Sequence, residues 1–510
     1  MTLTNGRAAL DAALLIAVTA ISRFAFRSHY LYDIDSVNFA LALRHYDPSV
    51  HQPHPPGYFL YICLGRLFNV VFNDANDAFV AIGIAFSCAA VLMIYLLAGE
   101  WFGRGAAIFA SLVFVFSPLA WFHGTVALVY VAEAFFSALT GYLCWRAYAG
   151  SSRYAYLAAA AAGIGAGFRP SFLVLLAPLL LFSFRGLNRR GAFISAATLG
   201  ASVAIWAWPM LAISGAGSYF SALGSLWGTV PGKGTLFNSS VANSVARACT
   251  IAGIYVLGFG CAAVLPWAGG RRPSVDDRRM ITFTWVWLIP GLLFFTFIYL
   301  KFVNSGYLLV LVPPICVWMG LWGSRFIGGV RGPRSVRVLI AAVGAAMNTI
   351  IFIAAPVYCS YGAVRRFESE LRDVIGTVRR LAPPRDTVIV GFDSHFLGYR
   401  HAGYYLPEYL TVEFPAVQLA EGRRIFAMKD GNTRLEQSVA DPGVRSFLTF
   451  PLPEGDEYRE YFANIQARFP VQNVRTIVEG GHLYVTGPLE DLRFLFPDSG
   501  GSTGELAYKP

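Results

Sequence analysis

Long apolar segments recur through most of the chain, and short polar segments separate them. Each holds roughly 17–23 residues, enough for an α-helix to cross a hydrocarbon core about 30 Å thick. The pattern therefore predicts an α-helical polytopic membrane protein with about eleven transmembrane helices. The predicted spans lie near 8–26, 75–98, 105–122, 124–144, 155–168, 171–184, 191–213, 250–268, 281–299, 306–324 and 336–357.

Two of these spans, 155–168 and 171–184, are short and are separated by Arg169-Pro170. The pattern leaves open whether they form two short helices or one broken helix. The number of crossings is odd in either case, because basic clusters flank the pair on both sides.

The pattern changes after residue 357, where charged residues become frequent and the apolar runs shorten to strand length. Strands are predicted at 387–392, at 445–450 and in a hairpin over 475–487 with Gly-Gly at its turn. The segment 363–381 has helical periodicity. We therefore predict a transmembrane domain over 1–357, a soluble α/β domain over 358–510 and a disordered tail near 498–510.

Composition supports a membrane protein, because 56% of the residues are hydrophobic and only 14% are charged. Soluble domains typically carry about 25% charged residues. The net charge of +10 does not point to nucleic acid, since the arginines cluster in alternate short loops, as expected on the cytoplasmic side of a membrane. These arginines are Arg7, Arg104, Arg146, Arg153, Arg185, Arg189, Arg190, Arg271, Arg272, Arg278, Arg279, Arg325, Arg331, Arg334 and Arg337.

The distribution of arginines predicts a cytoplasmic N-terminus, whereas the first polar loop and the C-terminal domain face outward. The first apolar run is expected to stay as a membrane span and not to be removed as a signal peptide. The seven cysteines are scattered and form no C-x-x-C pair, so neither a disulfide framework nor a cysteine-based zinc site is indicated.

The first outward loop, residues 33–61, reads DIDSVNFALALRHYDPSVHQPHPPGYFLY and is rich in titratable groups. Asp35 precedes a short amphipathic segment suited to the membrane surface. Asp35 or Ser36 could simply cap this helix. Asp33 adds a second carboxylate, more than one cap needs, and two carboxylates suit a general base or a cation site. Each histidine of the loop, His54 included, could equally be an interfacial side chain.

Two ionisable residues stand out in the apolar part of the chain. Glu133 lies within a predicted span, where an ionisable group is costly and points to function. The alternative is that it is a buried partner for a nearby arginine. Arg169 lies on the outward side, against the general bias of the arginines, so we expect an anionic group to hold it. A lipid phosphate fits, because guanidinium offers two parallel donors to phosphate oxygens.

The chain resembles the membrane glycosyltransferases of the GT-C superfamily. The resemblance begins with Asp35-Ser36 before a short helix and continues with the HPPGY motif that starts at His54. It extends through 120–139, 161–181 and KFVNSGYLLVLVPPICV at 301–317. The nearest relatives by these motifs are the protein O-mannosyltransferase-like, aminoarabinose transferase-like and rhizobial lipopolysaccharide transferase-like members.

The resemblance implies a hexosyl- or pentosyltransferase that takes its sugar from a polyprenyl-phosphate donor. It assigns the catalytic role to Asp35, with Asp33 as second candidate, and makes Glu133 a substrate or metal candidate. Many members carry Arg directly before the tyrosine of the last motif, where this chain has Gly306, so Lys301 is expected to stand in. The residues expected at the donor phosphate are Arg169, Lys301, His54 and Tyr307.

The aminoarabinose branch often has Lys at the position of His54, so its substrate is not carried over. The acceptor could be a lipid, a glycan or a protein. A divalent cation (Mg, Mn or Zn) is left open, and the expected location is the outer face of a bacterial inner (plasma) membrane.

Two other functions are compatible with parts of this pattern. A transporter or flippase of a lipid-linked or anionic substrate could use Asp35, Glu133 and Arg169, but transporters usually show internal repeats and midplane sites. An assembly or sensor protein would need only an anchor, for which eleven spans are excessive. In the C-terminal domain, Asp393, His395 and His401 follow a strand, where polar residues usually form turns, and acceptor contact is favoured over catalysis.

Overall fold

The structure, a computed structural model, describes residues 6–229, 241–268, 278–392, 394–414, 418–420, 423–425, 445–451 and 473–488. The chain divides into two compact units. Unit 1 comprises Met1–Tyr30 and Phe39–Arg365, and unit 2 comprises Leu31–Asn38 and Arg366–Pro510. The predicted division at residue 357 placed the whole first loop in the membrane domain. In the structure, Leu31–Asn38 at the start of this loop belongs to unit 2. The predicted disordered tail lies outside the described residues.

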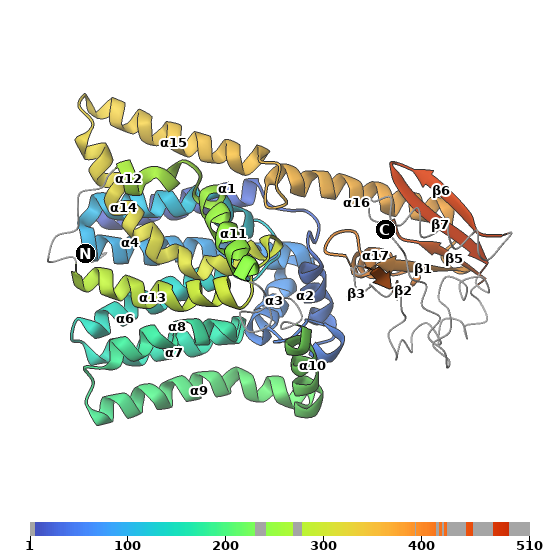
Figure 1. Ribbon diagram of the computed structural model, residues 1–510, viewed down its shortest axis with the longest axis horizontal. Helices are drawn as coiled ribbons and strands as arrows, with labels where there is room; N and C mark the ends of the chain where they lie inside the picture. The colour runs from blue at the N-terminus through green and yellow to red at the C-terminus, as the bar shows by residue number, and fades with distance from the viewer. Residues whose placement is uncertain are drawn as a thin grey trace. The chain divides into compact units, whose positions relative to one another are not determined.

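The described part of unit 1 is built from helices, and α4 is central because it packs against α1, α3, α6 and α14 (Figure 1). The elements in chain order are α1 (Gly6–Ala25), α2 (Ile34–Arg44, which begins in unit 2), η1 (Pro48–Val50), α3 (Phe59–Phe72), α4 (Ala75–Val115), α5 (Pro118–His123), α6 (Tyr130–Tyr148), α7 (Ser152–Phe168), α8 (Ser171–Phe184), α9 (Arg189–Ser214), α10 (Ala216–Thr229), α11 (Val241–Phe259), η3 (Gly260–Val264), α12 (Leu265–Ala268), α13 (Arg278–Phe297), η5 (Phe302–Leu311), α14 (Val312–Gly329) and α15 (Arg334–Ala354).

The helical polytopic architecture predicted from the apolar pattern is confirmed. Seven of the described helices are long and apolar enough to cross a membrane, and helices also occupy the other predicted spans. Arg169-Pro170 separates two helices, α7 and α8, because Pro170 has no N–H with which to continue α7. The predicted spans 75–98 and 105–122 are both helical, the first in α4 and the second in α4 and α5, and the non-helical backbone of Gly103 (φ 81°, ψ 179°) separates them as predicted.

Helix α3 was not predicted as a separate apolar helix. It has 14 residues and contains Arg66, so it falls short of the length and uniformity of a full span. Arg66 donates to the carbonyls of Leu43 (3.0 Å) and Ala42 (3.1 Å) at the end of α2. The last turns of α3 expose Val70 and Val71, which marks an apolar surface that the sequence pattern alone assigned to the polar loop.

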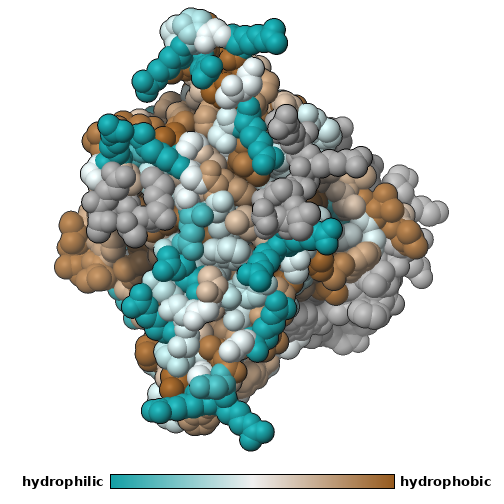
Figure 2. All heavy atoms as spheres, turned by 90° about the vertical axis from the view of Figure 1, so that its left-hand side faces the viewer, coloured by the Kyte–Doolittle hydropathy of each residue, from teal (hydrophilic) through white to brown (hydrophobic). Residues whose placement is uncertain are grey.

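Basic residues of alternate loops gather at one end of the unit 1 helices. Arg104 forms a two-pronged ion pair with Asp11 of α1 (2.5 and 2.8 Å), and Arg146 pairs with Glu100 of α4 (3.1 Å). Figure 2 shows this end of the molecule, with hydrophilic side chains across it and hydrophobic ones at its margins. The two contacts place Arg104 of α4 and Arg146 of α6 beside residues of α1 and α4 at this end of unit 1, and the side of the membrane that this end faces stays a prediction.

Unit 2 contains a five-stranded mixed sheet of order β2-β1-β5-β7-β6. Strand β1 is parallel to β2 and β5, while β7 is antiparallel to β5 and β6. The apolar side chains of Val388, Ile389, Val390, Phe447 and Leu448 are buried. The elements are α16 (Tyr361–Leu381), β1 (Thr387–Phe392), α17 (Tyr399–Tyr405), β2 (Leu410–Phe414), β3 (Gln418–Ala420), β4 (Arg423–Ile425), β5 (Ser446–Thr449), β6 (Arg475–Glu479) and β7 (His482–Pro488).

The local signals placed α16, β1, β5 and the hairpin of β6 and β7, whereas α17, β2, β3 and β4 were not predicted. Helix α16 buries Phe367, Leu371, Val374 and Val378, which recur every three or four residues along one face. The hairpin turn between β6 and β7 falls on Gly480 and Gly481, whose positive φ angles (61° and 84°) suit glycine. The predicted soluble α/β domain is confirmed in its class.

Arg23 is fully buried in unit 1, near the C-terminal end of α1. Its guanidinium donates to the carbonyl of Val115 at 2.6 Å and to that of Phe114 at 3.5 Å. It also lies 5.2 Å from the ring centroid of Trp121. These carbonyls close the C-terminal end of α4, where a cation is favoured by the helix dipole. Arg23 therefore ties α1 to the end of the central helix.

We predict that Arg23→Met lowers the stability of the protein by about 2–3 kcal/mol, because hydrogen bonds to charged groups contribute about 1.5–3 kcal/mol. The apparent Tm of the detergent-solubilised chain, measured at one fixed heating rate, should fall by several degrees. Arg27→Met is the matched control, since Arg27 donates only to the neighbouring Phe24 carbonyl at 3.0 Å. Equal Tm values for the two variants would contradict the prediction.

Candidate active site

Arg169 and Glu133 form a buried ion pair in unit 1. Arg169 follows the last turn of α7, and Glu133 lies in the first turn of α6. Arg169 Nη1 is 2.8 Å from Glu133 Oε1, and the two residues expose only 8% and 2% of their surfaces. The ion pair agrees with the alternative that Glu133 is a buried partner for an arginine. Glu133 is also an anionic group of the kind expected to hold Arg169. Moving two charged groups out of water costs free energy, and their attraction offsets this cost only when they lie in close contact, as they do here.

Aromatic rings fix the plane of the Arg169 guanidinium. Its central carbon lies 3.6 Å from the ring centroid of Tyr307 in η5 and 5.5 Å from that of Tyr130 in α6. A guanidinium has five N–H donors, and within the described residues the side chain of Arg169 makes one hydrogen bond, to Glu133. The remaining donors are therefore available to an anionic ligand.

Gly306 explains how η5 approaches this cluster. A Cβ at position 306 would lie 2.4 Å from Cδ2 of Tyr130 and 2.7 Å from Cε1 of His123. The rings of Tyr130 and His123 thus occupy the space that a side chain at 306 would need. This packing accounts for the absence of the basic residue that the resemblance led us to expect before Tyr307.

His54 lies in the loop between η1 and α3, half-buried, with Nε2 2.8 Å from the hydroxyl of Tyr58. Its ring also lies near Phe39, with centroids 6.2 Å apart. Burial lowers the pKa of His54 to about 3, and the positive charge of Arg169 acts in the same direction. His54 is therefore neutral near pH 7. It could serve a phosphate as a hydrogen-bond donor but not as a cation.

The HPPGY segment is held in place by backbone contacts within unit 1. Tyr46 donates to the carbonyl of Gly57 at 2.9 Å, and Tyr219 of α10 donates to that of Pro56 at 3.1 Å. Gly57 has φ 102°, and Tyr58 adopts φ 45°, an uncommon conformation for a bulky residue. This local geometry orients the Tyr58 hydroxyl toward His54.

Four of the predicted site residues therefore come together in unit 1: His54, Glu133, Arg169 and Tyr307. Lys301 is exposed at the N-cap of η5 and forms no ion pair within the described residues. Tyr130 and His123 were missed as part of the cluster. One indication of their role was present in the sequence, because both lie in the motif around Glu133. Their contact with Gly306 could not be predicted, since it depends on the packing of η5 against a segment far away in the chain.

Asp33 and Asp35 begin α2 in unit 2. The backbone N–H of Asp35 donates to Asp33 Oδ1 at 2.8 Å, so Asp33 takes the capping role that we had considered for Asp35 or Ser36. Desolvation raises the pKa of Asp33 to about 7, with a smaller contribution from Asp35, while His395 opposes the rise. Asp33 caps the helix that carries Asp35.

Residues of the C-terminal domain hold this Asp-bearing segment. The N–H of Leu31 donates to the Tyr405 hydroxyl at 2.7 Å, and the N–H of Ile34 donates to the His395 carbonyl at 2.9 Å. Tyr32 packs between Phe367 and Phe396, with ring centroids 5.1 and 4.9 Å away. His395, which we expected near an acceptor, is thus a neighbour of Asp33, while Asp393 lies outside the described residues.

Among the described residues, no three His, Cys, Asp or Glu side chains come close enough to bind a metal ion together. Mg²⁺ is usually bound through one or two carboxylates together with water and substrate phosphates, so the pair Asp33 and Asp35 neither requires nor excludes such an ion. A divalent cation therefore stays an open prediction.

Comparison with known proteins identifies the fold. The family described as Protein O-mannosyl-transferase TMEM260 N-terminal domain matches residues 48–190. ArnT from Cupriavidus metallidurans is similar in structure, both bound to undecaprenyl phosphate (TM-score 0.58, 14% identity, 95% of this chain and 98% of that chain) and in the apo state (TM-score 0.56, 13% identity, 96% and 98%).

The archaeal oligosaccharyltransferase AglB from Archaeoglobus fulgidus, in complex with an inhibitory peptide and a dolichol-phosphate, is also similar (TM-score 0.50, 13% identity, 99% of this chain and 76% of that chain). A comparison with curated protein sequences gave no match. ArnT and AglB are both GT-C glycosyltransferases. The chain has the GT-C fold, and the resemblance inferred from the sequence motifs is confirmed.

We predict that Gly306→Ala destabilises the protein by about 1–3 kcal/mol, the usual cost of overpacking a well-filled core. The added Cβ would overlap the rings of Tyr130 and His123. Gly200→Ala in α9 is the control, because a Cβ there meets no atom within 4 Å. Apparent Tm values should fall for the first variant only, and a Tm for Gly306→Ala at or above that of Gly200→Ala would refute the packing argument.

Proposed function

We propose that this chain, a multi-pass membrane protein with the GT-C fold, is a glycosyltransferase that moves a sugar from a polyprenyl-phosphate donor to an acceptor hydroxyl. One observation carries the proposal: a buried guanidinium, Arg169, is oriented by Glu133 and Tyr307 and keeps most of its N–H donors uncommitted. A fixed fork of donors suits a phosphate group. The similar structures with bound undecaprenyl phosphate and dolichol-phosphate support this choice of donor.

In the proposed reaction, the acceptor oxygen attacks the anomeric carbon and the bond from that carbon to the phosphate oxygen breaks. The proton of the acceptor hydroxyl passes to Asp35, and the polyprenyl phosphate leaves with an added negative charge. Arg169 stabilises that charge, which is where pre-placed donors lower a barrier most. Tyr307 holds the guanidinium plane, neutral His54 donates a hydrogen bond, and Lys301 contributes long-range attraction from its exposed position.

The proposed location is a bacterial inner (plasma) membrane, with a cytoplasmic N-terminus and the C-terminal domain on the outer side. The gathering of basic residues at one end of the helices supports this orientation. The acceptor, whether lipid, glycan or protein, is not specified by these residues. A transporter or flippase function has no specific observation in its favour.

We predict that Asp35→Asn reduces sugar transfer by at least about 100-fold, within the range that a general base contributes. The assay uses the purified full chain with synthetic polyprenyl-phosphate mannose first and other polyprenyl-phosphate sugars next. Asp373→Asn, an exposed change in α16, is the matched control and should retain transfer. Undiminished transfer by a correctly folded Asp35→Asn protein would remove Asp35 from the mechanism.

The pH profile tests how Asp33 takes part. Because its pKa is raised to about 7, Asp33 is protonated below that pH and ionised above it. We predict that transfer rises as the pH increases through about 7 and that Asp33→Asn removes this rise. His395 lowers the pKa of Asp33, so His395→Ala should move the midpoint to higher pH. An unchanged profile in both variants would show that Asp33 titration does not govern the reaction.

A further inference from the structure

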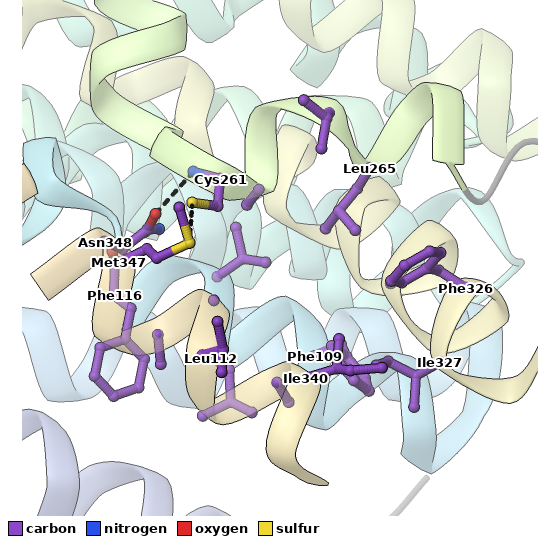
Figure 3. Close-up of a pocket in the computed structure, with 18 of the residues that line it drawn as sticks. Phe109, Leu112, Phe116, Cys261, Leu265, Phe326, Ile327, Ile340, Met347 and Asn348 are labelled. Carbon is purple, nitrogen blue, oxygen red and sulfur yellow. Dashed lines mark hydrogen bonds between the residues drawn. The ribbon is translucent and has the colours of Figure 1, made fainter. Parts of the chain in front are cut away.

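A cleft in unit 1 lies between α15 and the helices α4, α12 and α14, beside η3 (Figure 3). It has a volume of about 300 Å³ and is lined by residues of α4, η3, α12, α14 and α15. Its walls include Phe109, Leu112, Leu265, Phe326 and Ile340. The volume is about twice that of an engineered apolar cavity of about 150 Å³ that holds a benzene molecule.

The wall of the cleft is almost entirely apolar, although Asn348 is part of it. Asn348 Nδ2 donates to the carbonyls of Phe116 (3.0 Å) and Phe259 (2.9 Å), and its Oδ1 accepts from the N–H of Cys261 at 2.8 Å. These bonds satisfy the amide within the protein. The occupant of the cleft must therefore be apolar where it contacts the wall.

The cleft is open at the surface of the helices, since lining residues such as Val264, Phe326 and Met347 are exposed by 58%, 36% and 50%. Only 11% of the spanning window of α15 is buried. An apolar space of this size, left unfilled, forgoes the dispersion contacts that stabilise packed helices. A flexible hydrocarbon chain that enters from the side would be apolar where it contacts the wall, and it would also fill the open space.

A cationic group lies directly beyond the cleft on the same face of α15. Arg337 precedes Ala341, Gly344 and Asn348 of the cleft wall by successive steps of four, three and four residues, the spacing of one helix face. The Nε atom of Arg337 is buried and has no hydrogen-bond partner in the described part of the chain. A buried N–H donor of this kind favours an acceptor supplied from outside.

Further arginines lie near Arg337 in the sequence, and residues 321–354 contain no Asp or Glu. Arg325 lies on α14 beside Phe326, Arg331 lies between α14 and α15, and Arg334 is the first residue of α15. Within the described residues, none of these side chains forms an ion pair. The apolar cleft therefore ends beside arginines whose positive charge is not balanced by any acidic residue within 321–354.

We propose that this cleft binds the acyl chain of an anionic phospholipid, whose phosphate accepts hydrogen bonds from Arg337 with Arg325, Arg331 and Arg334 around it. A free phosphate would leave the cleft empty, and a zwitterionic lipid would leave the arginines uncompensated. Each Arg near an anionic membrane surface contributes about 1 kcal/mol of attraction, so several together select strongly by charge. This lipid site is independent of the proposed transferase activity.

Native mass spectrometry of the full chain from nanodiscs tests the proposal directly. The nanodiscs contain equal amounts of phosphatidylglycerol and phosphatidylcholine with the same acyl chains. Retention of phosphatidylglycerol should exceed that of phosphatidylcholine by about tenfold, which corresponds to about 1.4 kcal/mol. Equal retention of the two lipids would overturn the proposal.

Two variants separate the two parts of the site. Arg337→Gln should lower retained phosphatidylglycerol by about tenfold, because one charge-assisted contact is lost, and Arg190→Gln at the exposed start of α9 should not. Gly344→Phe should exclude the acyl chain, since an added Cβ meets no atom within 4 Å and a ring can fill the cleft. Gly200→Phe in α9 meets equally open space and should retain the lipid.

Arg337→Gln keeps the test decisive if Gly344→Phe fails to fold, because it changes a partly exposed side chain. Unchanged lipid retention in a folded Arg337→Gln protein would overturn the proposal. So would displacement of the phosphatidylglycerol by inorganic phosphate, or preferential retention of added polyprenyl phosphate, which would make the cleft a donor-tail site. Exchange of the lipid for a second copy of the chain, seen as a dimer mass, would also overturn it.

Discussion

A guanidinium group that leaves water inside a bundle of apolar helices must be given partners, and the arrangement of unit 1 follows from this constraint at Arg169. The partners come from segments that are far apart in the chain: Glu133 from α6, Tyr307 from η5 and the His54 loop before α3. Each is brought to the same place because an unpaired charge there would cost several kcal/mol. The ion pair therefore fixes the relative positions of three helical segments.

The same pair shapes the chemistry that the cluster can perform. Glu133 balances the charge of Arg169 before any ligand binds, so the ion pair as a whole carries no net charge while the guanidinium is held in position. His54 adds no charge, because burial keeps it neutral near pH 7. A phosphate that arrives at this cluster finds directed donors and not a strong positive field. Selectivity then depends on geometry, that is, on the guanidinium plane fixed by Tyr307.

The sequence predicted those features of the fold that depend on local pattern. The helices, the strands β1 and β5 and the hairpin of β6 and β7 follow from periodicity and turn residues. Helix α3 was missed because its 14 residues, although mostly apolar, are too few to cross a membrane and include Arg66. The break between the predicted spans 75–98 and 105–122 falls at Gly103, whose positive φ is a conformation that glycine adopts readily.

Features that depend on packing between distant segments could not be predicted from local pattern. Motifs named Glu133 and Arg169 separately, but nothing in either motif shows that they bond to each other. In the sequence, Gly306 only marks a position where related proteins often have Arg. The positions of Tyr130 and His123 in the structure show that a side chain would not fit there. The association of Leu31–Asn38 with the C-terminal unit is likewise a matter of contacts over more than 300 residues of chain, such as Leu31 with Tyr405.

That association changes how the C-terminal domain relates to the proposed chemistry. A carboxylate can act as a base only if its position and its charge are both controlled. Unit 2 controls the position of the Asp33–Asp35 segment through the backbone bonds to Tyr405 and His395 and the packing of Tyr32. It controls the charge through His395, which opposes the rise in the Asp33 pKa. The C-terminal domain is therefore part of the catalytic apparatus in the proposed reaction, whichever acceptor it also contacts.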